Sequence, residues 1–342
     1  MGKIRYIGSK VRIAEQILSI IGQPNKNSGT LIDLFSGTGT ISRNAALNGW
    51  KIVANDYLYS SSLITKAQLI SKDDVSFKKV GSYDKVIAEL NSQSPKDGFI
   101  FREYSPSGKS RSGHSRKYFT CENASKIDAI RIKIEEFYLN EKIGINEYHL
   151  LIADLLEASN QVANIAGTYG CFLSSFASNS LNILKLSTRE FINRRAGFTV
   201  QNSDSFKLIS KANDIVYIDP PYTKRQYPAY YHILETISYY DSPFVDGVTG
   251  LRPWKEKSSP FCFKRKAPQA FKQLLSGLKA KEIYISYSSE GHVPIEELTS
   301  ICQSYGEIKL HELGGIGRYA PNTAAVSKGK EVKEYLIHIN VQ

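Results

Sequence analysis

Residues 31–40, LIDLFSGTGT, decide the fold that this sequence predicts. The apolar run Leu31–Phe35 has the length and composition of a buried strand, and Ile41–Leu47 after it has those of a helix. Between them, Gly37 and Gly39 let the backbone pass close to a ligand, toward which the first amides of the helix point. A strand, a glycine turn and a helix in this order predict the first crossover of a doubly wound nucleotide-binding sheet.

The glycine turn differs from two well-known phosphate-binding patterns. Ser42 occupies the third glycine position of the dinucleotide fingerprint, and the lysine of the phosphate-binding loop is absent. A ligand that has an adenosine but no pyrophosphate fits this turn better. The next predicted strand, Lys51–Asn55, ends at Asp56, where an acid can accept hydrogen bonds from both ribose hydroxyls. The alternative interpretation of Asp56 is a solvated acid at a strand end.

A second informative feature is the run Asp219-Pro220-Pro221-Tyr222, which follows the predicted parallel strand Asp214–Ile218. Each proline fixes its φ angle and has no amide donor, so acceptors near this corner can face outward. A stiff, acceptor-rich corner under a flat ring suits an exocyclic amino group on a planar base. The alternative interpretation is a Pro-Pro turn that only ends the strand.

Taken in order, these segments resemble S-adenosylmethionine-dependent amino-methyltransferases. More narrowly, they resemble the Dam-like, alpha-group N6-adenine DNA methyltransferases of type II restriction-modification systems. The segments that carry the resemblance are Arg5–Lys10, Asp33–Thr40, Asn55–Asp56, Asn202–Phe206 and Asp219–Tyr222. The resemblance covers both ends of the chain well and its middle weakly. It implies an α/β fold: a Rossmann-like methyltransferase sheet with an antiparallel last strand, plus an inserted, mostly helical target-recognition domain.

The resemblance also implies S-adenosylmethionine as cofactor and assigns residues to its site. These residues are Tyr6, Lys10, Asp33, Phe35, Ser36, Gly37, Thr38, Gly39, Asp56 and Asp204. Asp33 and the glycine turn would hold the methionine part, and Asp56 the ribose. Asp204 would take the amino group of the cofactor adenine, with a helix cap as the alternative. Tyr6 and Lys10 would line the methionine side or the mouth of the pocket.

The implied catalytic residues are Asp219, Pro220, Pro221 and Tyr222. Asp219 and the carbonyl of Pro220 would each accept a hydrogen bond from adenine N6, while Tyr222 stacks on the base. This frees the lone pair of N6 for in-line attack on the methyl group, with proximity supplying much of the acceleration. The scheme requires no metal and no strong base. Because a duplex hides N6, the adenine must be flipped out of the stack.

The composition agrees with a nucleic-acid substrate and sets limits. The chain has 342 residues, a formal net charge of +11 and a sequence pI near 9.2, as expected for a protein that binds phosphates. A basic protein without a polyanion partner is the alternative. The four cysteines include no C-x-x-C pair, which argues against zinc and disulfides. No signal pattern and no apolar run of ~18 residues is present, so we expect a bacterial cytoplasmic protein without membrane segments.

The domain organisation follows from an unusually long interval between two predicted strands. The distance from the glycine turn to the fourth strand of such a sheet is usually under about 100 residues, and the interval from Thr40 to Asp214 is much longer. We therefore predict a catalytic domain formed by residues 1–70 and 199–342, and an inserted target-recognition domain formed by residues 71–198. Near the C-terminus, alternation predicts a closing antiparallel hairpin of strands 308–313 and 334–340.

The predicted insert combines helical segments with a basic loop. Ala124–Leu139 and His149–Ile165 have helical spacing, and Phe99–Lys117 is rich in Gly, Ser, Pro and basic residues. Five cations of this loop are candidate DNA contacts, namely Arg102, Lys109, Arg111, Arg116 and Lys117. A solvated, disordered loop is the alternative. After the catalytic corner, Arg225 is expected to hold a phosphate on a mobile loop, and His232 to pack at the start of the next helix.

The function predicted from the sequence is transfer of a methyl group to N6 of a flipped adenine in a short duplex DNA sequence. The partners are double-stranded DNA and a possible cognate restriction endonuclease, and the expected state is a monomer. An RNA base methyltransferase, acting on adenine N6 or guanine N2, carries a similar corner and is one alternative. A catalytically silent nucleic-acid-binding protein is another. A cytosine-N4 enzyme ranks lower, since it usually has Ser in place of Asp219.

Overall fold

The computed structural model describes residues 4–108, 110, 113–314 and 332–341. The chain forms two compact units. Unit 1 consists of Met1–Ile7, Ile70–Asn193 and Tyr227–Glu256, and unit 2 of Gly8–Leu69, Arg194–Gln226 and Lys257–Gln342. Unit 1 thus contains most of the predicted insert, together with the N-terminal segment and the segment Tyr227–Glu256.

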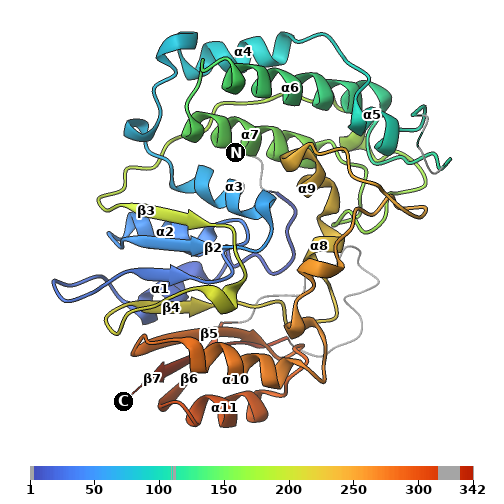
Figure 1. Cartoon of the computed structure of the whole chain (residues 1–342). Coiled ribbons are helices and arrows are strands. Elements are labelled where there is room, and N and C mark those ends of the chain that lie inside the picture. The colour runs from blue at the N-terminus through green and yellow to red at the C-terminus, as the bar shows by residue number, and fades with distance from the viewer. Residues whose placement is uncertain (1–3, 109, 111–112, 315–331, 342) are drawn as a thin grey trace. The chain divides into compact units, whose positions relative to one another are not determined.

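Unit 2 contains a seven-stranded sheet with the order β3-β2-β1-β4-β5-β7-β6. The strands are β1 (Leu31–Asp33), β2 (Ile52–Asn55), β3 (Phe198–Gln201), β4 (Ile215–Ile218), β5 (Glu282–Ser288), β6 (Glu307–Leu313) and β7 (Glu334–Asn340). The first five strands pair in parallel with one another, whereas β7 is antiparallel to both β5 and β6. The predicted α/β Rossmann-like methyltransferase fold and its closing hairpin are therefore confirmed (Figure 1). Strand β3 was not predicted.

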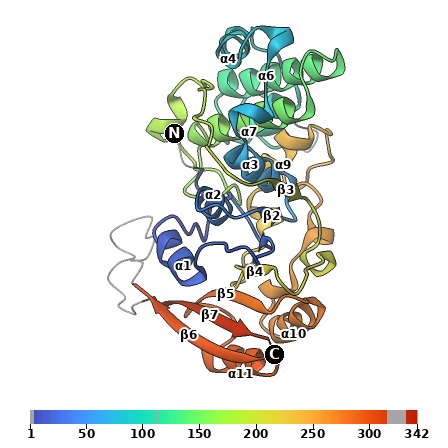
Figure 2. The ribbon, with the colours of Figure 1, turned by 90° about the vertical axis from the view of Figure 1, so that its left-hand side faces the viewer.

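The helices of unit 2 are α1 (Ala14–Ile21), α2 (Thr40–Leu47), α3 (Tyr59–Leu69), α10 (Ala267–Gly277) and α11 (Ile295–Gln303), with short 3-10 turns at Ser205–Lys207 and Pro260–Cys262. Figure 2 shows α1 and α10 on opposite faces of the sheet. The central strands are apolar on both faces because helices cover both. Residues such as Val216, Ile218 and Ile285 pack with Phe271 and Leu274 of α10 in the buried core.

Unit 1 is mostly helical. Its helices are α4 (Tyr83–Ser92), α5 (Phe99–Tyr104), α6 (Cys121–Leu139), α7 (Ile145–Gln161), α8 (Tyr227–Tyr230) and α9 (His232–Tyr239), with 3-10 turns at Lys72–Asp74, Lys78–Val80 and Ser178–Leu181. The 3-10 turn Lys255–Lys257 lies where unit 1 passes into unit 2. Helix α6 begins after Thr120, whose side chain accepts a hydrogen bond from the Asn123 amide, and α6 packs against α4, α5 and α7.

Candidate active site

The catalytic corner lies at the carboxyl end of β4, in the middle of the sheet. Strand β4 is flanked by β1 and β5, and the strand order reverses between β1 and β4. Ligands bind at such a reversal point, outside the carboxyl ends of parallel strands. The corner is held in place by Tyr222, whose ring meets the Tyr287 ring edge-to-face at 5.5 Å and whose carbonyl accepts a hydrogen bond from the His292 amide at 2.8 Å. Asp219 therefore projects from a rigid edge.

Asp219 has a buried cationic partner, Lys10. The Lys10 Nζ atom lies 3.1 Å from Asp219 Oδ1 and 3.5 Å from Glu334 Oε2, and it lies 5.5 Å from the centre of the Tyr222 ring. Lys10 is only 5% exposed. The sequence pointed to Lys10 only as a pocket-lining residue and did not point to Glu334 at all. The one available signal was a buried acid at the start of strand β7.

Burial and charge act in opposite directions on this group. Burial raises the pKa of Asp219 to about 6; Lys10 moderates the rise and Glu334 adds to it. Burial by itself would lower the pKa of Lys10, but the surrounding acids and phenols, with Asp219 foremost, raise it well above its ordinary value. Near neutral pH the pair is therefore a buried lysinium and a carboxylate, and Asp219 can accept hydrogen bonds.

The glycine turn is folded against Asp56, as a set of short hydrogen bonds shows. The Gly37 amide donates to Asp56 Oδ2 at 2.9 Å, and the Leu58 amide donates to Asp56 Oδ1 at 2.9 Å. Gly37 and Gly39 have φ angles of 54° and 78°. A side chain at Gly39 would also place its Cβ atom 2.9 Å from the Thr65 backbone, so glycine is required there for both reasons. The turn and Asp56 thus form one preorganised element.

Asp33, at the end of β1, provides the observation that tests the fit of a cofactor. Its Oδ2 atom accepts a hydrogen bond from the Ser42 hydroxyl at 2.6 Å, while its buried Oδ1 atom has no hydrogen-bond partner among the described residues. Burial raises the pKa of Asp33 to about 7, and the charges of Asp219 and Asp56 add to this. A buried acceptor without a partner suits an ammonium group, which would hold the carboxylate ionised.

Asp204 lies close to the end of β2 through a network centred on Asn55. The Asn55 side chain accepts from the Ser203 amide at 3.1 Å and donates to the carbonyls of Ser203 at 3.1 Å and Leu34 at 3.2 Å. Asp204 caps the following 3-10 turn, accepting from the Phe206 amide at 3.1 Å. The cap alternative for Asp204 is thus observed, while its cofactor role stays a prediction. Asn55 thus positions the segment that contains Asp204. It belongs to one of the segments that carry the family resemblance, but the sequence predicted no role for it.

A family model for D12 class N6 adenine-specific DNA methyltransferases matches residues 6–301. The chain belongs to this family. The resemblance seen in the sequence is therefore confirmed.

Several type II methyltransferases are similar to this D12-class chain. M.FokI of Planomicrobium okeanokoites is 35% identical over 98% of this chain and 52% of its own length. M.NlaIII of Neisseria lactamica is 33% identical over 90% of each chain, and M.CviAII of Paramecium bursaria Chlorella virus 1 is 30% identical over 100% of each. The chain thus spans about half the length of M.FokI and of the modification methylase LlaI of Lactococcus lactis subsp. lactis, which it covers by 54%.

Another cofactor residue predicted for this D12-class chain, Tyr6, belongs to unit 1. Its ring stacks on the Tyr231 ring at 4.5 Å, and the neighbouring Arg5 donates to the carbonyl of Asn160 in the last turn of α7 and to those of Ala163 and Ile165 after it. The structure therefore gives Tyr6 an anchoring role within unit 1. Its place in the cofactor site stays a prediction.

The predicted DNA contacts of this D12-class chain differ in exposure. Arg102 and Arg225 are exposed, and Lys117 is half-buried, with its Nζ atom donating to the Ser174 carbonyl at 2.8 Å. Lys109 and Arg111 lie outside the described residues. Arg116 is 0% exposed, and its guanidinium is bonded to carbonyls and to Glu103 within unit 1. This burial contradicts the expected direct contact between Arg116 and DNA, because a phosphate cannot reach its donors.

His232 is fully buried, with Nε2 3.0 Å from the Tyr169 carbonyl, and burial lowers its pKa to about 3. The packing role expected for it is observed. Among the described residues, no helix has the length and apolar character to cross a membrane. Nor does that part of the chain contain a cluster of three or more His, Cys, Asp or Glu side chains suited to a metal ion.

Proposed function

We propose that this protein transfers a methyl group from S-adenosylmethionine to N6 of an adenine flipped out of duplex DNA. The observation that carries the proposal is the position of Asp219. It directly follows β4 at the edge of the sheet where the neighbouring strand β1 ends in Asp33, and its carboxylate is held ionised by buried Lys10. Membership of the D12 class supports adenine N6 as the acceptor.

The described residues fit S-adenosylmethionine, which would supply an electrophilic methyl group on a sulfonium. The unpartnered Oδ1 atom of Asp33 would accept from the α-ammonium group of the methionine part. Asp56 would hold the ribose hydroxyls, with the amide hydrogen bonds from Gly37 and Leu58 fixing its orientation. Asp204 would hold the amino group of the adenine. Phe35, Ser36, Thr38 and Gly39 would complete the wall formed by the glycine turn.

In the proposed mechanism, Asp219 and the Pro220 carbonyl accept the two N6 hydrogens of the target adenine. Withdrawing these hydrogens from the ring plane would localise the nitrogen lone pair on N6. Asp33, Asp56 and the glycine turn would hold the cofactor, which would supply the methyl group: the N–C bond would form as the C–S bond breaks, with the neutral thioether as the leaving group. Lys10 occupies Oδ1 of Asp219, so Oδ2 is the oxygen available to N6. Tyr222 stacks on the base, and Pro221 keeps the corner rigid. The methylated nitrogen then loses a proton to Asp219 or to water.

Unit 1 is proposed to recognise the target sequence, in keeping with the predicted inserted domain of residues 71–198. Arg102, Lys109, Arg111 and Lys117 would contact DNA from this unit, and Arg225 would hold a phosphate near the catalytic corner. We propose a monomer, because one flipped adenine requires one active site. The names of the relatives support a restriction-modification setting, with a possible endonuclease partner in a bacterial cytoplasm.

The test is transfer of labelled methyl from S-adenosylmethionine to unmethylated genomic DNA and, in parallel, to total RNA, with the modified positions mapped. We expect N6-methyladenine in one short DNA sequence, which would also reveal the recognition site. Label in RNA alone would replace this proposal with RNA base methylation. Cofactor binding without label in either polymer would indicate a catalytically silent nucleic-acid-binding protein.

A further inference from the structure

Residues Asp246–Leu251 of unit 1 form a short turn that is closed by several backbone hydrogen bonds. The Asp246 and Leu251 backbones pair in both directions, at 3.0 Å and 2.9 Å, and the Gly250 amide donates to the Gly247 carbonyl at 3.1 Å. Gly247 and Gly250 have φ angles of 68° and 65°, which favour glycine. The turn lies after the catalytic corner in sequence and outside the predicted insert, yet it belongs to unit 1.

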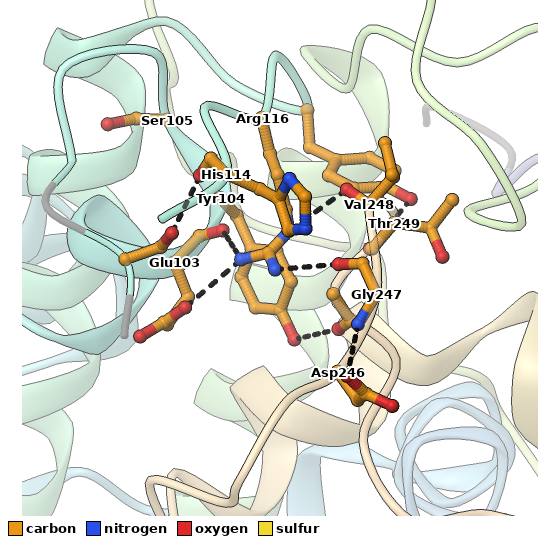
Figure 3. Close-up of polar contacts among 12 residues, drawn as sticks. Glu103, Tyr104, Ser105, His114, Arg116, Asp246, Gly247, Val248 and Thr249 are labelled. Atoms are coloured by element: carbon orange, nitrogen blue, oxygen red, sulfur yellow. Dashed lines mark hydrogen bonds and ion pairs between the residues drawn. The ribbon is translucent and has the colours of Figure 1, made fainter. Parts of the chain in front are cut away.

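Four successive carbonyls of this turn are held by buried side chains from the segment 104–118 (Figure 3). Arg116 donates to Gly247 O at 2.9 Å and to Val248 O at 3.1 Å, and Tyr104 donates to Gly250 O at 3.0 Å. The Tyr118 hydroxyl shares its hydrogen between Tyr169 O at 2.8 Å and Thr249 O at 3.1 Å. Burying a guanidinium costs several kcal/mol of desolvation, which only a complete set of hydrogen bonds offsets. Here Glu103 completes that set, 3.0 Å from Arg116.

The bound carbonyls determine where the amides of the turn point. In a trans peptide the carbonyl of one residue and the amide of the next point in opposite directions. Because the carbonyls of Gly247 and Val248 point to Arg116, the amides of Val248 and Thr249 point away from it. Neither amide has a hydrogen-bond partner among the described residues. The side chain of Val248 is 60% exposed beside them, and the Asp246 carboxylate is also exposed.

We infer that the turn Asp246–Leu251 reads base edges of the DNA target. The inference rests on the proposed function and extends it to a specificity element. The turn offers two fixed amide donors for purine N7 or carbonyl acceptors, a methyl-rich side chain for a thymine methyl, and a carboxylate acceptor for an amino group. A phosphate would meet the charge of Asp246, so a base edge fits this set of groups better. Arg116 acts as a positioning residue that keeps the turn rigid.

The test compares Val248→Ala and Asp246→Asn with the control Leu139→Ala, which removes a side chain that is 72% exposed at the end of α6 in the same unit. Asparagine keeps an oxygen for the Gly247 amide, which Asp246 Oδ1 now accepts at 2.7 Å. The readout is kcat/KM on the recognition duplex mapped for the wild type and on duplexes that differ from it by one base pair. We expect discrimination at one base pair to fall about 10-fold in each turn variant, with cofactor affinity and unfolding temperature unchanged, and the control to match the wild type.

Two results would overturn the inference. An equal loss of kcat/KM on all duplexes would make the turn a phosphate contact or a scaffold, and unchanged discrimination would mean that it does not read the DNA. Either result leaves the proposed function intact, because the wild type would still methylate DNA in these experiments. A wild type that fails to methylate DNA would instead contradict the proposed function itself. Tyr104→Phe, which loses a single donor to Gly250 O, tests the positioning step without removing the buried guanidinium, and should also lower discrimination.

Discussion

The Nζ atom of Lys10 lies 3.1 Å from Oδ1 of Asp219, and both side chains are largely buried. Residues that are 209 apart in sequence therefore form one charged pair at the end of β4. The lysine keeps the acceptor ionised where burial alone would favour its protonated form. Glu334 approaches the same lysine from β7 at 3.5 Å. The catalytic corner thus depends on two residues from opposite ends of the chain.

Replacing Lys10 should shift the pH dependence of methyl transfer upward. In Lys10→Met the cation that lowers the pKa of Asp219 is gone, so the pKa rises above about 6 and the acid limb of kcat/KM moves to higher pH. At pH 7 a pKa of about 7 would leave about half of Asp219 ionised and a pKa of about 8 about a tenth, so we expect kcat/KM to fall between about 2-fold and about 10-fold, with recovery at higher pH. The exposed neighbour Arg12 provides the control, and Arg12→Met should leave the profile unchanged. An unmoved acid limb in Lys10→Met would refute the electrostatic role.

Replacing Glu334 should have the opposite sign. Glu334 raises the pKa of Asp219, so Glu334→Gln should lower it and move the acid limb of kcat/KM to lower pH. The amide keeps the size of the side chain and its place at the start of β7. A purely structural role would lower stability without moving the pH profile. Measuring kcat/KM across pH for both variants separates the two explanations, since only electrostatics predicts movements in opposite directions.

Replacing Asp219 should stop catalysis and spare the cofactor. Asp219→Ala removes the acceptor for N6, so we expect methyl transfer to fall by at least about 10²–10³-fold, while the affinity for S-adenosylmethionine measured by calorimetry stays close to that of the wild type. Glu296→Ala, at an exposed acid on α11, is the control. Loss of cofactor binding along with activity in Asp219→Ala would instead assign the residue a structural role.

The ionised form of Asp33 should lower the stability of the fold and yet favour binding of the cofactor. Its pKa is raised from 3.8 to about 7, mainly by burial, so folding favours the protonated form. The stability from this group is full below pH 3.8 and is lost as pH rises through 7. The free energy of unfolding of Asp33→Asn, taken relative to that of the wild type, should therefore be larger at pH 8 than at pH 5, growing by about 1.4 kcal/mol for each pH unit below 7. The variant should also bind S-adenosylmethionine more weakly. Urea unfolding at both pH values and a binding titration test this; equal differences at both would contradict it.

Two glycines with similar positive φ angles, although with different ψ angles (−170° at Gly22 and 17° at Gly39), allow a comparison. Gly39 (φ 78°) lies against the Thr65 backbone, whereas a side chain at Gly22 (φ 84°) would meet nothing within 4 Å. Both alanine variants should lose about 1–3 kcal/mol of unfolding free energy through backbone strain. Only Gly39→Ala should also weaken cofactor binding, because the added methyl displaces the glycine turn. Similar cofactor affinities in both variants would separate this turn from the cofactor site.

Local signals in the sequence predicted most of the sheet and the edge at which the candidate catalytic residues lie. Short apolar strands, positive-φ glycines and the Pro-Pro corner are local signals, because neighbouring residues impose them. They were sufficient for strands β1, β2 and β4, although not for β3, and for placing Asp33, Asp56 and Asp219 at the carboxyl ends of these strands. The same signals led to the family that the comparisons confirm.

Only the tertiary structure decided which side chains meet. Lys10 and Glu334 are separated by 324 positions, and no periodicity in a sequence predicts a pair of that kind. The basic loop predicted an exposed Arg116, but its guanidinium is buried because carbonyls of the Asp246–Leu251 turn, more than 130 residues away, accept its hydrogen bonds. The charge and spacing of residues describe only their neighbours along the chain. The burial of a side chain depends on residues distant in the sequence, which pack against it only in the folded protein.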